Sequence, residues 1–167
     1  MSRTVKYTFL SMVLTIFTTQ TAFAQEKAPE RSLEGAWIVK ITPRTACEGG
    51  DPVPAFAFES LITFHQGGTT SMSIKGNTNI ATLVRTPFHG LWRKEHGWNT
   101  YKFKVMHIRS LAATMEFRGL QETGGTVTLS ESGDEFTTDG YTLGYSVDGV
   151  PGPPNCSNSA GVRLKLD

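Results

Sequence analysis

The four histidines are the residues whose chemistry would be easiest to recognise in this sequence. His89 and His96 are seven residues apart, a separation of about 23 Å in an extended strand. His65 and His107 stand alone in the sequence, and no H-x-H, H-E-x-x-H or C-x-x-C spacing occurs. We therefore predict neither a metal site nor a cofactor.

Nucleophilic and acid–base catalysis also lack a recognisable motif. Ser71 and Ser73 have no G-x-S-x-G pattern around them, so the strand–turn–helix setting of a serine nucleophile is missing. Asp134, Glu135 and Asp139 surround a predicted turn, where acidic side chains are most simply solvated. No catalytic residue is predicted from these patterns.

The two cysteines, Cys47 and Cys156, are the remaining candidates for chemistry. In an oxidising compartment two cysteines most simply form one disulfide. The alternative is a reactive nucleophile, which would need a base close by in space. We predict a Cys47–Cys156 disulfide that closes a long loop.

The first 24 residues have the features of a cleavable export signal. Arg3 and Lys6 precede a mostly apolar run from Phe9 to Phe17, and the small-x-small pattern at 22–24 favours cleavage after Ala24. The run is shorter than the roughly 20 apolar residues of a membrane-spanning helix. We expect a signal peptide at 1–24, a periplasmic or secreted protein, and no integral membrane span after cleavage.

Composition sets further limits. Of the 167 residues 38% are hydrophobic and 19% charged, with a formal charge of +1, which fits an ordinary globular domain. The near-neutral charge lacks the basic surface that nucleic-acid binding requires. We therefore predict no nucleic-acid partner.

The elements that would position any site are β-strands, because apolar residues recur with a period of two. Apolar rows begin at Trp37, Phe56 and Tyr101, and turn residues separate them. Two further rows expected to face inward are Tyr141, Leu143, Tyr145 and Val147, and then Val162, Leu164 and Leu166. Eight strands are predicted: 35–42, 56–65, 69–75, 86–95, 99–108, 120–131, 135–147 and 159–166. The segment 109–119 is not assigned.

Eight short antiparallel strands joined by hairpins predict an all-β, up-and-down barrel or a related sandwich. We expect a flexible leader at 25–32 and a single β-barrel domain at 33–167. Barrel closure removes exposed sheet edges, and the disulfide favours closure because it would join the first and last strands. An outer-membrane barrel is disfavoured, because Lys102, Lys104 and Lys165 would face lipid.

Two patterns resemble known proteins. Gly35-Ala36-Trp37 resembles the G-x-W motif of lipocalins and other calycins, in which the Trp closes one barrel end beside an Arg of the last strand. The resemblance implies structural roles for Gly35, Trp37 and Arg163, although the later T-D-Y motif of lipocalins is absent. The segments 63–69 and 89–93, together with Tyr101, resemble uncharacterised exported bacterial lipocalin-like proteins and imply no activity.

The inward aromatic residues are the candidate ligand site. They would line a cavity for a small hydrophobic or amphipathic ligand; the alternative is a packed core without a cavity. Two other functions stay open: a cyclase or isomerase acting by confinement, and a protein-interaction module using the outer face or the Gly149–Pro154 loop. The candidate lining is Trp37, Phe58, Phe64, Trp92, Tyr101, Phe103, His107, Tyr141 and Tyr145.

Overall fold

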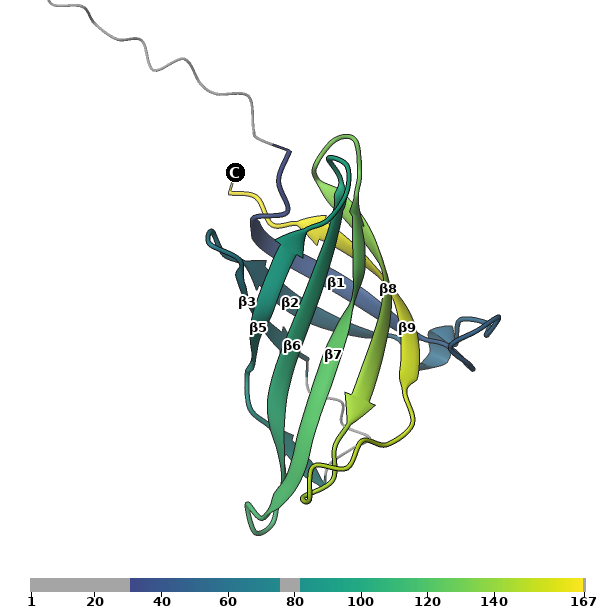
Figure 1. Cartoon of the computed structure of the whole chain (residues 1–167), viewed down its shortest axis with the longest axis vertical. Coiled ribbons are helices and arrows are strands. Elements are labelled where there is room, and N and C mark those ends of the chain that lie inside the picture. Colours follow the sequence, from purple (N-terminus) through teal and green to yellow (C-terminus); the bar gives the residue numbers. More distant parts are fainter. Residues whose placement is uncertain (1–30, 76–81, 167) are drawn as a thin grey trace, which may run out of the picture. The chain divides into compact units, whose positions relative to one another are not determined.

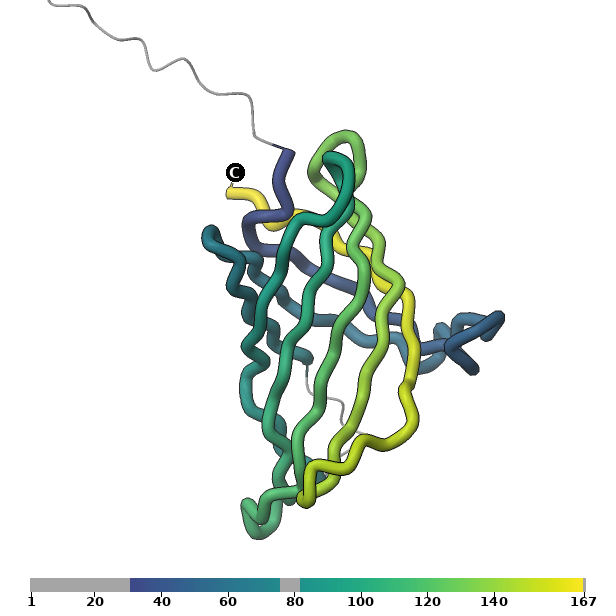
Figure 2. The backbone as a smooth tube through the Cα atoms, in the orientation of Figure 1, coloured from purple at the N-terminus to yellow at the C-terminus, as the bar shows by residue number. Residues whose placement is uncertain are grey.

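The computed structural model describes residues 31–75 and 82–166. The predicted signal peptide and most of the predicted leader lie outside these residues. Figures 1 and 2 show the described chain as one wall of strands wrapped around an interior. The described residues include no helix that has the length and the apolar character needed to span a bilayer.

The strands form a closed antiparallel barrel. Apart from β4, which pairs only with β6, the strands pair in the order in which they follow along the chain, and β9 pairs with β1 to close the sheet. This confirms the predicted all-β, eight-stranded, up-and-down architecture. The strands are β1 (Gly35–Pro43), β2 (Phe58–Phe64), β3 (Thr69–Ile74), β4 (Leu83–Arg85), β5 (Phe88–Lys94), β6 (Thr100–Leu111), β7 (Phe117–Leu129), β8 (Glu135–Gly144) and β9 (Asn155–Arg163). A short 3-10 helix, η1 (Pro54–Phe56), precedes β2.

Strands β4 and β5 together occupy one position in the barrel, because both pair with β6. The interruption falls at Thr86 and Pro87. Proline has no N–H to give to the sheet, and the Thr86 hydroxyl instead accepts a hydrogen bond from the Ile108 N–H at 3.0 Å. Nine assigned strands therefore make an eight-stranded barrel.

Strand boundaries differ from the prediction mainly at the last strand. It was expected at 159–166 but runs from Asn155 to Arg163. The unassigned segment 109–119 contains the end of β6, a turn, and the start of β7. Met115 in that turn has a φ of 58°, and its N–H donates to the Leu111 carbonyl.

One end of the barrel is closed by Trp37, which is fully buried. The Arg163 guanidinium lies over its indole ring at 4.3 Å and donates to the carbonyls of Ser32, Glu34 and Gly133. Gly35 has a φ of +126°, and a Cβ there would lie 2.7 Å from Arg163 Nη1. The contact that the calycin resemblance implies between Trp37 and Arg163 is therefore present.

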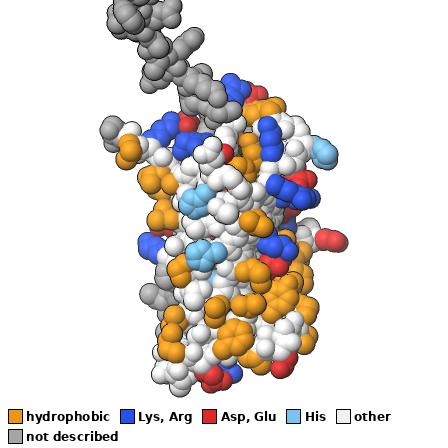
Figure 3. Space-filling view, turned by 60° about the vertical axis from the view of Figure 1, so that its left-hand side comes forward, with side chains coloured by type: hydrophobic (Ala, Val, Ile, Leu, Met, Phe, Trp, Pro, Cys, Tyr) orange, Lys and Arg blue, Asp and Glu red, His pale blue; other side chains and the backbone are white. Residues whose placement is uncertain are grey.

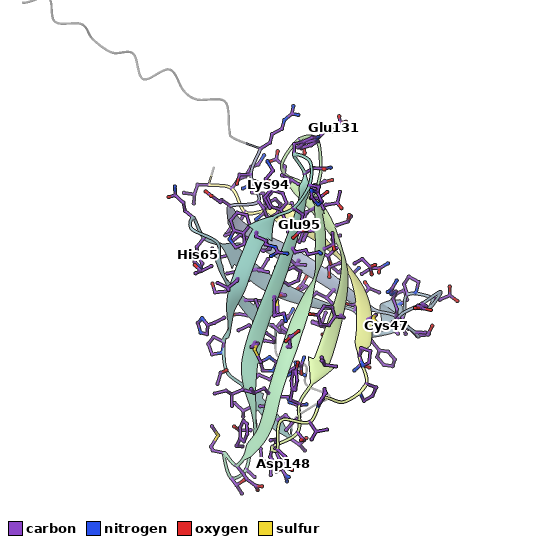
Figure 4. All side chains as sticks on the ribbon, viewed as in Figure 1. Cys47, His65, Lys94, Glu95, Glu131 and Asp148 are labelled. Carbon is purple, nitrogen blue, oxygen red and sulfur yellow. A yellow bond between two sulfur atoms is a disulfide. The ribbon has the colours of Figure 1, made fainter. Side chains whose placement is uncertain are left out.

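The predicted disulfide joins Cys47 to Cys156. Cys47 lies in the long loop between β1 and η1 that projects from the barrel wall (Figure 4), whereas Cys156 lies in β9. Arg44 strengthens the junction, because its N–H donates to the Cys156 carbonyl and its guanidinium to the Cys47 carbonyl. The bond thus ties the loop to the seam where the barrel closes.

Candidate ligand-binding cavity

The barrel interior is filled at the Trp37 end and hollow beyond it, where a cavity of about 360 Å³ remains. One wall comes from β1, β2 and β3, whose inward positions carry large apolar side chains because alternate residues face the core. Phe103 of β6 and Phe136 of β8 extend this wall. Its aliphatic and aromatic members from the first three strands are Val39, Ile41, Phe58, Ile62, Phe64, Met72 and Ile74.

The opposite wall is polar and uncharged. It comes from the parts of β7, β8 and β9 that border the cavity, where the inward side chains carry hydroxyl or amide groups. The cavity exists because these side chains are too short to reach the apolar wall. The members of this wall are Gln121, Thr123, Thr138, Thr142, Asn155, Ser157 and Ser159.

Arg85 of β4 is the one charged residue among the described residues lining the cavity. No hydrogen bond or ion pair joins its guanidinium to another described residue. Its register partner on β6 is Arg109. Burial and the positive charge of Arg109 both lower the pKa of Arg85. The cavity therefore contains positive charge without a carboxylate to balance it.

The predicted site residues divide into separate groups. Phe58, Phe64 and Phe103 line the cavity. Trp37 and Tyr101 belong to the packed core of the closed end, where the Tyr101 hydroxyl donates to the Trp98 carbonyl. Trp92 packs against that core.

Trp92 also holds the turn between β2 and β3. Its indole N–H donates to the His65 carbonyl at 2.9 Å, and its ring lies 5.9 Å from that of Phe64. A tryptophan in this position stabilises the wall of the barrel. This hydrogen bond explains the positions of Trp92 and His65, so no ligand is needed to explain them.

His107 is buried near the arginines and lies outside the packed end. It is 3% exposed, its ring lies 3.9 Å from that of Phe88, and neither ring nitrogen has a hydrogen-bond partner among the described residues. Burial, followed by the charges of Arg85 and Arg109, lowers the pKa of His107 to about 4. The imidazole is therefore neutral at neutral pH.

This shift predicts a loss of stability in mild acid. The unfolded chain takes up a proton at His107 near pH 6.5, whereas the folded protein resists protonation until about pH 4. The free energy of unfolding should therefore fall as the pH drops through this window, by about 3 kcal/mol for this residue. Urea denaturation of the wild type and of His107→Leu at several pH values would measure it.

The control for this experiment is His89→Leu, because His89 is exposed on the outer face of β5. Only the His107 variant should show a flatter dependence on pH, since contributions from the carboxyl groups are common to all three proteins. Equal slopes in the three proteins would contradict the prediction.

Tyr141 and Tyr145 do not face the interior, so the alternation expected for this strand was wrong. On β8 the inward residues are Phe136, Thr138 and Thr142, which places Tyr141 on the outer face. The expected inward row of the last strand was also reversed, since Val162 and Leu164 are more than half exposed. Both tyrosines instead contact Glu122, another outer residue.

Glu122 is a buried carboxylate with a complete set of partners. Tyr141 donates to its Oε1 at 2.7 Å, Tyr145 donates to Oε2 at 3.4 Å, and Lys104 Nζ lies 3.1 Å from Oε1. Burial would raise the pKa of Glu122, but these partners leave it below its usual value. Burial and the Glu122 contact raise the pKa of Tyr141 to about 12. This cluster links β6, β7 and β8 on the outer wall of the barrel.

Apolar side chains also gather on the outside of the barrel. Figure 3 shows them over the lower part of one face, and the exposed large residues include Val84, Met106, Ile108, Met115 and Phe117. On the same outer wall a groove of about 800 Å³ runs past Leu91, Lys102 and Tyr141. In the described part of the chain, no three His, Cys, Asp or Glu side chains converge as a metal site would require.

Sequence reasoning missed Arg85 and the polar wall. The available signal was Arg163: if it packs beside Trp37 inside the barrel, Gly161, Ser159 and Ser157 must face inward with it.

Taken together, the strands enclose a cavity with one apolar wall, one hydroxyl-bearing wall and one cationic side chain. No protein-family model matches the chain, and no curated protein matches its sequence.

Proposed function

We propose that this protein is an exported, calycin-type barrel that binds one small amphipathic molecule in its interior. The observation that carries the proposal is the cavity of about 360 Å³. Its volume lies within the usual range of about 300–1,000 Å³ for small-molecule sites. The apolar wall would bury the hydrophobic side of a ligand, and the Thr and Ser hydroxyls would bind its polar side.

The calycin assignment is supported by the packing of Arg163 on Trp37 and by the positive φ of Gly35. Export is supported by the disulfide, because such bonds persist in oxidising compartments. The sequence pattern at 1–24 agrees with this location. Binding without catalysis is favoured, because Tyr101 and Tyr141, whose hydroxyl groups a confined reaction could use, lie outside the cavity lining.

Ligand binding can be tested by thermal shift against decanol, decanoate and retinol. A ligand at about 100 times its dissociation constant should raise the melting temperature by roughly 5–10 °C. Thr138→Phe should abolish this shift, because Thr138 lines the cavity and the larger side chain would fill it. The variant's own melting temperature shows whether it has folded.

The matched control is Thr137→Phe, one residue away on β8 and exposed on the outer face. This variant should bind as the wild type does, because its added ring points away from the cavity. The proposal fails if no compound stabilises the wild type, or if both variants respond to the ligand equally.

A further inference from the structure

Arg85 is an unbalanced charge in an otherwise uncharged cavity. All the other described residues that line the cavity are neutral. Arg85 is half-buried, and partial removal of a guanidinium from water has a cost that an anion or several acceptors can offset. Nothing in the described part of the chain supplies that anion.

The neighbours of Arg85 increase the imbalance. Arg109 lies opposite it in the β4–β6 register and directs part of its guanidinium to the carbonyls of Arg118 and Tyr145. The Nε of Arg109 is buried and has no hydrogen-bond partner in the part of the chain that the structure describes. The hydrogen bonds of Arg109 therefore go to main-chain carbonyls, while its charge adds to the positive potential at Arg85.

Further hydrogen-bond donors lie at the same level of the barrel. Gln121 is the register partner of His107 and lines the cavity. Asn155 and Thr142 form the next pair on the polar wall. His107 is buried, and neither ring nitrogen has a partner within the described residues. In its neutral form one of these nitrogens carries a proton.

We infer that the ligand of this cavity carries a carboxylate, and that Arg85 binds it. The inference rests on the proposed ligand-binding function and narrows it to an amphipathic acid. A planar guanidinium binds a carboxylate through two parallel hydrogen bonds. The alkyl part of the acid then lies along the apolar wall of β1, β2 and β3, between Arg85 and the packed end at Trp37.

The first arm of the test compares decanoate with decanol on the full chain at neutral pH, by isothermal titration calorimetry. Their chains are alike and only the head group differs. Decanoate should bind about tenfold to hundredfold more tightly, the range expected for a hydrogen-bonded charge pair. Decylamine, whose charge is opposite, should bind more weakly than decanol.

The second arm uses Arg85→Gln, which should remove the preference for decanoate and leave decanol binding unchanged. Arg85 makes no hydrogen bond to another described residue, so the variant should fold, and its melting temperature checks this. Arg85→Lys should restore part of the preference. Arg118→Gln is the matched control, because Arg118 has the same charge but an exposed side chain that faces Glu116.

The outcomes separate the two proposals. A decanoate preference that disappears only in Arg85→Gln supports the carboxylate site. Equal binding of decanoate and decanol, unchanged in Arg85→Gln, overturns the carboxylate site and leaves the ligand-binding function standing. Failure of all three probes to bind the wild type counts against both.

Discussion

Removal of the disulfide is expected to lower the free energy of unfolding by about 4–5 kcal/mol. The bond joins residues separated by 109 positions, so it restricts a large part of the unfolded chain. The double variant Cys47→Ser/Cys156→Ser should therefore unfold at a much lower urea concentration. Comparison of urea denaturation curves for the two proteins measures the difference.

Two controls isolate the effect of the covalent bond. Reduction of the wild type with dithiothreitol should produce the same loss as the double variant, and reductant should leave the double variant unchanged. The hydrogen bonds from Arg44 to Cys47 and Cys156 use main-chain carbonyls, so they can survive the substitutions. A loss below about 1 kcal/mol would show that the folded barrel does not depend on the bond.

Truncation of Trp37 is expected to cost about 3–5 kcal/mol. Its side chain is fully buried, its ring lies 4.8 Å from that of Phe136, and its indole N–H donates to the Leu33 carbonyl at 3.0 Å. Trp37→Ala would leave a void at the closed end and remove the surface on which Arg163 packs. The free energy of unfolding from urea titration is the measurement.

Two further variants make this prediction specific. Trp37→Phe keeps an aromatic ring but loses the hydrogen bond to Leu33, so its cost should be nearer about 1 kcal/mol. Trp98→Ala removes an indole that is 41% exposed, and it should change stability by less than about 1 kcal/mol. If Trp37→Ala were no more damaging than Trp98→Ala, the closed end would not be the stabilising core described above.

The first half of the barrel was predictable from local pattern. On β1, β2 and β6 the inward positions are the large apolar ones, as Trp37, Phe64 and Phe103 show. Alternation of apolar and polar residues therefore identifies the buried face directly. The disulfide was predictable as well, because only Cys47 and Cys156 were available.

The same rule failed on β8 and β9. There the inner face carries Thr138 and Ser159, whereas the outer face carries Tyr141 and Val162. Alternation shows that the two faces of a strand differ. The more hydrophobic face is the inner one only where the inner side chains pack against other side chains. A wall that borders a cavity can be polar, and outer apolar residues can cover a buried carboxylate such as Glu122.

By itself the sequence determined the strand count and the up-and-down order, because these follow from spacing along the chain. It also determined the disulfide, because only two cysteines are present, while the closed end at Trp37 was implied by the resemblance to calycins. Only the tertiary structure decided that the interior is hollow and that Arg85 reaches it. A cavity depends on the summed lengths of side chains facing each other across the barrel, from strands far apart in the sequence. Arg85 stands between Val84 and the Thr86-Pro87 pair, and nothing in this local sequence indicates that its side chain lines the interior.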